Sequence, residues 1–223
     1  MGDDDLWNAL PHASSGTDNP DAGPALLVEK IEGFKPLDAQ FGAVEPMFIP
    51  PQLRDVLFGE PEGSKAKTAS PLRVYAILDA AKVPGLPEML EAAFLESDCL
   101  FQGQSEEDIG DVSPWLVKLS PSAPLTRNLF TSGDAPWHLW DRAPVIVVGS
   151  KADMTAVRRH IRRFTSVQDR RGKWFMFRFW EADYLLAYLM ALTTTKQAEF
   201  MGPMRIIVTT GPDLRIVRWG EGS

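Results

Sequence analysis

The chain has 223 residues, a formal net charge of −7 and 44% apolar residues, which are the proportions of an ordinary soluble globular protein. Its longest uninterrupted apolar run, residues 184–192, has nine residues, whereas a membrane-spanning helix needs roughly 20. The acidic total also disfavours a dedicated nucleic-acid-binding protein, because phosphate contacts need a positive surface.

The first part of the chain is acidic and rich in proline. Residues 1–62 contain twelve acidic side chains, three basic ones and eight prolines, a mixture that disfavours an independent core. Residues 26–28 can start a short strand, and residues 51–59 have proline near a helix start and glycine past its end. We therefore predict a partly disordered extension over residues 1–71, ending in a linker, and one α/β domain over residues 72–223.

Strands and helices alternate in the main body. Residues 73–79, 116–119 and 145–148 are apolar and β-prone, and residues 84–96 keep helical spacing. Asp153 can cap a helix whose apolar stripe leaves Arg159 and Arg163 on the opposite side.

The carboxyl-terminal third continues this alternation. Residues 174–180 are apolar on both alternating faces, which predicts a strand in the centre of the sheet. Two helices, 184–192 and 194–201, and a hairpin of residues 205–210 with 214–219 follow. The expected fold is mixed α/β, a central mixed sheet flanked by helices with a C-terminal β-hairpin.

Motifs of common enzyme chemistry are missing from the sequence. It lacks the glycine pattern of a phosphate-binding loop, a nucleophile elbow and a dinucleotide fingerprint. The single Cys99 is expected to be a small buried residue, and one cysteine with three histidines is a poor set of metal ligands. We expect no cofactor and no metal, and the acidic start, unlike a secretory signal, favours a cytoplasmic location.

Basic residues cluster between positions 158 and 173, where Asp169 is the only acid. The cluster is Arg158, Arg159, Arg162, Arg163, Arg170, Arg171 and Lys173. Two interpretations stay open: a solvated helix face that attracts the acidic amino-terminal segment, or a docking surface for an acidic partner protein. We take the six arginines as candidate partner-binding residues, together with Trp137 and Trp140, which lie in a proline-rich loop and are expected to be exposed. Trp174 is expected in the core.

Arg178 is predicted to form a structural ion pair. Strand alternation places it beside Trp174 and Trp180, where an unpaired guanidinium would be costly. Asp79, at the end of the first strand of the main body, and Glu181 are the candidate partners, and we expect Asp79 to pair with Arg178.

Five segments of the chain, in their order and spacing, are similar to a known bacterial family. They are YAILDAA at 75–81, CLFQG at 99–103, VSPWLV at 112–117, VRRHIRRF at 157–164 and FRFW at 177–180. The family is catalogued as a domain of unknown function, and its members are associated with type VI secretion as adaptors or chaperones that load a toxic effector onto the valine-glycine-repeat spike protein. The resemblance covers residues 72–201.

This resemblance implies a non-enzymatic cytoplasmic adaptor whose partners are an effector and the spike protein. Neither a membrane nor a nucleic acid is implied as a partner. Two alternatives remain: a nucleic-acid-binding module that uses the arginines, and a hydrolase whose acids meet only in the fold.

Overall fold

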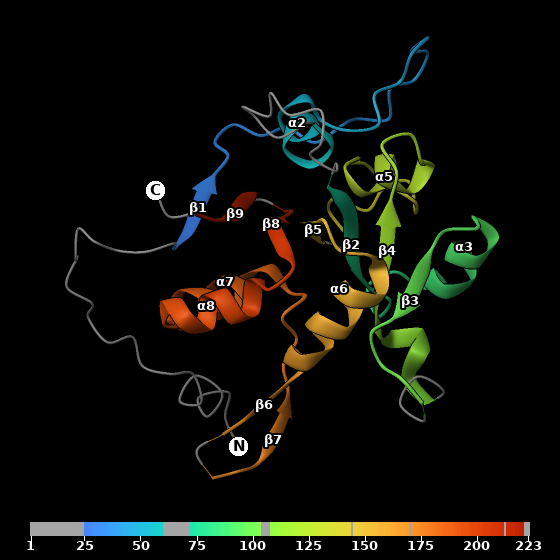
Figure 1. The fold of residues 1–223 in the computed structure, drawn as a ribbon. Coiled ribbons are helices and arrows are strands. Elements are labelled where there is room, and N and C mark those ends of the chain that lie inside the picture. Colours follow the sequence, from blue (N-terminus) through green and yellow to red (C-terminus); the bar gives the residue numbers. More distant parts are fainter. Residues whose placement is uncertain are drawn as a thin grey trace.

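A seven-stranded sheet forms the centre of the molecule (Figure 1), whose computed structural model describes residues 25–59, 72–103, 108–143, 145–169, 171–211 and 213–220. In spatial order the strands are β1 (Leu26–Lys30), β9 (Arg215–Trp219), β8 (Met204–Thr209), β5 (Ile146–Ser150), β2 (Arg73–Asp79), β4 (Pro114–Leu119) and β3 (Ser97–Cys99). The mixed α/β class and the C-terminal hairpin of β8 and β9 are confirmed.

The strand directions differ from the expected mixture, because every neighbouring pair in this sheet is antiparallel. Strand β2 lies between β4 and β5 and runs opposite to both. β4 and β5 therefore run parallel to each other without touching. The helices α6, α7 and α8 connect β5 to its direct neighbour β8, which runs antiparallel to it.

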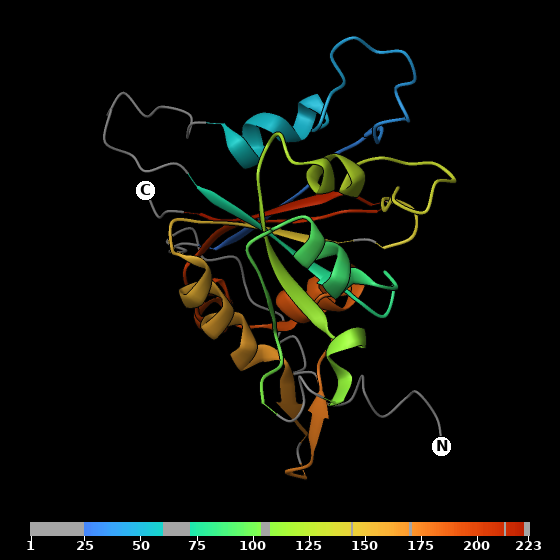
Figure 2. The same ribbon diagram turned by 90° about the vertical axis from the view of Figure 1, so that its right-hand side faces the viewer.

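Both faces of the sheet are apolar and covered by helices. On β2, Val74, Ala76 and Leu78 point to one core, whereas Tyr75 and Ile77 point to the other. The first core is covered by α2 (Pro51–Phe58), α3 (Leu86–Ala92) and α5 (Pro124–Leu129). The second is covered by α6 (Met154–Ile161), α7 (Ala182–Ala191) and α8 (Thr194–Met201), and Figure 2 shows α2 and α5 on the side of the sheet opposite to these three.

Part of the predicted extension is built into this fold. Strand β1 pairs with β9 from Leu26↔Trp219 to Lys30↔Arg215 and forms one edge of the sheet. Leu53 and Leu57 of α2 are fully buried in the first core. The described part of the extension thus contributes an edge strand and a covering helix, whereas residues 1–24 and 60–71 lie outside the described residues.

A second, two-stranded sheet projects from the body below α6 (Figure 1). It consists of β6 (Ser166–Gln168) and β7 (Trp174–Met176), and the short helix η2 (Arg162–Phe164) joins it to α6. The prediction of a central strand over residues 174–180 is wrong. Only three of those residues are extended, and Phe179 and Trp180 instead pack among the helices of the second core.

The remaining described helix is η1 (Gly110–Val112), just before β4. None of the helices in the described ranges has both the length and the apolar character needed to cross a membrane.

Candidate functional site

The candidate site begins with helix α6. The apolar residues of this helix face the sheet, so its basic side chains face outward. Asp153 caps the helix, because its carboxylate accepts a hydrogen bond from Ala156 N at 2.8 Å. Met154, Val157 and Ile161 are buried on the sheet side. Arg159 is therefore exposed on the other side and makes no ion pair within the described ranges.

A shallow hollow of about 280 Å³ lies along this outer side of α6. It is lined by Ala156, Arg159, His160, Arg163 and Pro203. Arg163 reaches Glu199 of α8 at 3.2 Å, but both side chains are largely exposed, so water competes with this pair. The hollow thus combines a small apolar floor with two guanidinium groups that a carboxylate could bind.

His160 supports one wall of the hollow. Its Nε2 lies 2.7 Å from the carbonyl oxygen of Phe200, and its ring packs against Phe164. Burial lowers the pKa of His160, and the nearby Arg163 adds to this effect, while the bond to Phe200 opposes it. The imidazole therefore joins α6 to α8, and its burial disfavours the charged form.

Arg158 does not belong to this outer surface, which corrects its selection as a partner-binding residue. Its Nε donates to the carbonyl oxygen of Cys99 at 2.7 Å, and Nη1 lies 3.6 Å from Asp98. Only 15% of the side chain is exposed. One helical step from Arg159 is about 100°, which is enough to turn Arg158 inward, where it ties α6 to β3.

The Asp169 carboxylate helps to hold the tip of the β6–β7 hairpin. Asp169 Oδ1 accepts hydrogen bonds from the backbone N–H groups of Arg171 and Lys173, both at 2.8 Å. Gly172 has φ +80°, a conformation that favours glycine. The side chains of Arg171 and Lys173 are left at the exposed tip, whereas Arg170 lies outside the described residues.

Trp174 is exposed on this hairpin, so its prediction as a core residue is wrong. Its side chain is 65% exposed and Met176, on the same strand face, is 54% exposed. A two-stranded hairpin has no second layer to cover both of its faces, which explains the exposure. We call α6, η2 and this hairpin, residues 154–176, the basic arm.

The two tryptophans of the loop before β5 have different surroundings. Trp137 is 58% exposed, as expected, but Trp140 is only 6% exposed and stacks on Phe34 with ring centroids 5.0 Å apart. The prediction that Trp140 is exposed is wrong, because Phe34 of the extension covers it. Trp140 therefore offers no surface to a partner.

Asp79 and Arg178 are brought together at the end of β2. Arg178 Nη2 lies 2.7 Å from Asp79 Oδ2, and its Nε lies 2.8 Å from Glu181 Oε1. Trp180 Nε1 donates to the same Asp79 oxygen at 3.3 Å, and the backbone N–H of Ala81 donates to the other oxygen at 3.0 Å. Both predicted carboxylate partners, Asp79 and Glu181, thus contact Arg178. We call this group the Asp79 corner.

Comparison of the sequence with protein families gives one match, which covers the central part of the chain. A family model described as "Domain of unknown function (DUF4123)" matches residues 74–199, which is more than half of the chain. The chain belongs to the DUF4123 family. No curated protein and no solved structure matches it.

The DUF4123 match nearly coincides with the stretch 72–201 on which the sequence resemblance was based, and this family is associated with type VI secretion adaptors. It includes the Asp79 corner and the whole basic arm. Strands β1, β8 and β9 and helix α2 lie outside it, although they belong to the same sheet and core. The fold is thus completed by strands and a helix outside the stretch that the family model matches.

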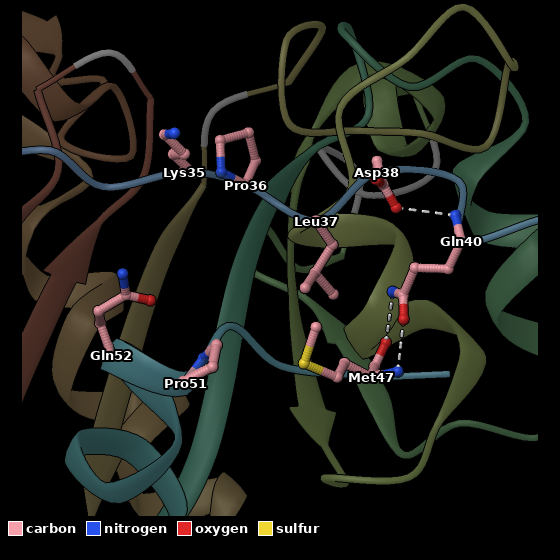
Figure 3. A pocket seen from close by; sticks show the side chains of 8 residues that line it. All are labelled: Lys35, Pro36, Leu37, Asp38, Gln40, Met47, Pro51 and Gln52. Atoms are coloured by element: carbon pink, nitrogen blue, oxygen red, sulfur yellow. Dashed lines mark hydrogen bonds between the residues drawn. The ribbon is translucent and has the colours of Figure 1, made fainter. Parts of the chain in front are cut away.

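A second hollow, of about 310 Å³, lies outside the DUF4123 match, beside the start of α2 (Figure 3). Asp38 is its only acidic lining residue, and the Asp38 carboxylate already accepts a hydrogen bond from Gln40 N at 2.9 Å. Neither hollow is lined by two carboxylates of the kind a hydrolase would use. No group of three or more potential metal ligands occurs among the residues the structure describes.

Sequence reasoning missed Trp174 and the link from His160 to Phe200. The signal for Trp174 was present, since it follows the polar turn 168–173 directly and its strand partner, residues 166–168, is polar at both ends. No sequence signal pointed to the contact between His160 and Phe200, because forty positions separate them.

Proposed function

We propose that this DUF4123 protein is a non-enzymatic adaptor that binds a type VI secretion effector and helps to load it onto the valine-glycine-repeat spike protein. It would act in the cytoplasm by stoichiometric binding rather than turnover. Family membership supports the general adaptor role. The basic arm supports binding of a protein partner.

One observation carries the proposal: the basic arm presents unpaired positive charge and an exposed tryptophan on one continuous segment of the chain. Arg159, Arg162 and Arg171 make no ion pair with any described residue. Trp174 is 65% exposed beside them in sequence. Arginine and tryptophan are the residue types that most often dominate binding energy at protein interfaces.

The chemistry of the arm indicates the chemistry of its partner. The whole chain has a net charge of −7, so the arm is a local positive pole on an acidic protein. An effector segment with carboxylates for Arg159 and Arg163 and an apolar group for Trp174 would match it. A partner with these features would also be steered toward the arm rather than toward the acidic remainder of the surface.

The test starts with affinity purification of the tagged full chain from its own host, with co-eluting proteins identified by mass. The recovered effector is then produced separately and titrated with the purified chain by calorimetry. The variant Arg159→Glu with Arg163→Glu should bind at least about tenfold more weakly, since each lost charged contact costs about 1–3 kcal/mol.

The matched control is Lys35→Glu with Arg54→Glu, which makes the same charge change at exposed positions of the extension. This control should bind the effector as the wild type does. Equal loss in both double variants, or no loss in the first, would remove the arm from the proposal. Recovery of nucleic acid instead of an effector, with steep salt dependence, would replace the proposal with the nucleic-acid alternative.

A further inference from the structure

The loop between β1 and α2 exposes an apolar tip that nothing in the described structure covers. Phe41 is 96% exposed, Val44 is 97% exposed and Met47 is 49% exposed. Figure 1 shows this segment extending from the body at the end opposite to the β6–β7 hairpin. Several apolar side chains exposed together on one loop, unlike a single one, are typical of a contact surface.

The tip is held in shape by the side chain of Gln40. Its Nε2 donates to the carbonyl oxygen of Met47 at 3.0 Å, and its Oε1 accepts from Met47 N at 2.7 Å (Figure 3). Gln40 adopts φ +50°, which is uncommon for a residue with a side chain and marks a strained position. Both polar atoms of the Gln40 amide are therefore hydrogen-bonded to the backbone of Met47, which holds the two sides of the loop together.

Both ends of the loop are anchored to the body. Leu37 is buried, its N–H donates to Phe130 O at 2.8 Å and its carbonyl accepts from Ser132 N at 2.8 Å. Arg127 donates to the carbonyl oxygen of Ala39 at 2.8 Å, and Ile49 is buried on the other side. The apolar tip is thus ordered before binding, which reduces the entropic cost of docking.

The charge of the loop selects the kind of surface that it can enter. Asp38 and Glu45 lie in the loop, and no basic residue occurs between Lys35 and Arg54. The complementary surface is a hollow with an apolar floor and a positive rim. The hollow along α6 has this composition, with Ala156 and Pro203 beside Arg159 and Arg163.

We propose that the tip of the loop, Phe41 and Val44, docks into the α6 hollow of a second copy of the chain, with Glu45 facing Arg159 and Arg163. α2 and α6 cover opposite faces of the sheet (Figure 2), so the loop and the hollow of one molecule point in different directions. The loop of one molecule therefore contacts the hollow of another molecule, and the contact joins two different surfaces. Such a contact forms rings or chains rather than a closed twofold dimer.

Self-association of this kind would cover the arginines that the proposed effector needs. The chain would then protect its own basic arm until an effector displaces the loop. This regulatory consequence rests on the proposed function. The contact itself does not, and it can be measured without any effector.

The first experiment is sedimentation velocity of the full chain over a wide concentration range at low and high salt. We expect the sedimentation coefficient to rise with concentration, and to rise less at high salt because the Glu45 contact is screened. Phe41→Ser with Val44→Ser should stay monomeric, as should Arg159→Glu with Arg163→Glu. Phe94→Ser is the matched control, because Phe94 is 95% exposed with φ +51° in another loop, and it should associate as the wild type does.

The second experiment mixes the two monomeric variants. The loop variant keeps an intact hollow, and the arginine variant keeps an intact loop. One contact can form between them, so the mixture should yield a species of twice 24.8 kDa that does not grow further.

A wild type that stays monomeric at all concentrations would overturn the proposal, as would association that survives in both variants. Loss of association in the loop variant alone would also overturn it, because a different surface or a different protein would then receive Phe41. The sedimentation measurements do not depend on the effector experiment. Either proposal can therefore be disproved without affecting the other.

Discussion

Arg178 in the Asp79 corner and Arg159 on the basic arm carry the same guanidinium group in opposite surroundings. Arg178 contacts Asp79 at 2.7 Å and Glu181 at 2.8 Å, and Asp79 is only 5% exposed. Arg159 is exposed and has no charged partner within the described ranges. In the corner the charges satisfy one another, whereas on the arm they are left for another molecule.

The comparison shows why identical residue types in one DUF4123 sequence have different roles. A carboxylate removed from water must be paired, so the corner is committed to stability. An exposed arginine contributes little to folding, so it can be kept for binding without loss of the fold. Substitutions can test this division between arginines that stabilise the fold and arginines that are exposed for binding.

Removal of the Asp79 carboxylate should give the largest loss of stability. Asp79→Ala leaves Arg178 Nη2, Trp180 Nε1 and the N–H of Ala81 without their acceptor, and we expect the free energy of unfolding to fall by about 2–4 kcal/mol. Urea unfolding measures this change. Asp79→Asn keeps the side-chain shape and an acceptor for Trp180 and should lose less; equal losses in the two variants would assign the whole effect to the lost charge and none of it to the retained acceptor.

Arg158 and Arg159 are neighbours on one helix. We expect Arg158 to stabilise the fold and Arg159 to be free for binding. Arg158→Ala removes the hydrogen bonds to the Cys99 carbonyl and should lower the free energy of unfolding by about 1–2 kcal/mol. Arg159→Ala should change it by less than about 0.5 kcal/mol. The same urea titration tests both, and a larger loss in Arg159→Ala would contradict the division.

Trp174 should be nearly neutral for stability and important for binding. Because its side chain is 65% exposed, Trp174→Ser should change the free energy of unfolding by less than about 0.5 kcal/mol. Its affinity for the effector should fall at least about tenfold if Trp174 is a binding hot spot. Phe94→Ser, at a 95% exposed position outside the arm and outside the candidate partner-binding residues, serves as the control and should retain affinity.

The pH dependence of stability should show the smallest effect. Burial lowers the pKa of His160 in the folded state, so as pH falls through about 6.5 the unfolded chain takes up a proton that the folded chain resists. The free energy of unfolding therefore decreases on acidification, and this contribution stops below the folded-state pKa. Urea unfolding between pH 7.5 and 5 should show a shallower decrease in His160→Gln, while an identical decrease would exclude His160 as the source.

Much of the fold could be predicted because it depends on local patterns. The apolar stripe of α6 and its Asp153 cap were readable from spacing alone, and so was the hairpin around residues 211–213. The pairing of Asp79 with Arg178 is also predicted correctly, although Arg178 is 43% exposed and Trp174, one of its two expected aromatic neighbours, belongs to the separate hairpin.

The errors came from contacts that depend on distant segments. Trp140 is buried in the first core, where Phe34, more than one hundred positions earlier, stacks on it. Arg158 is drawn inward by the carbonyl of Cys99, and Trp174 is exposed because its strand joins a small separate hairpin. Periodicity reports which side of an element is apolar, but it does not report what lies against that side.

The most direct test of the account is hydrogen exchange of the full chain, free and bound to its effector. We expect slower exchange on binding in residues 154–176, with little change in β2 and in the start of α7 around the Asp79 corner. Unchanged exchange across the basic arm, with protection elsewhere on the molecule, would contradict the assignment of the arm as the effector-binding surface.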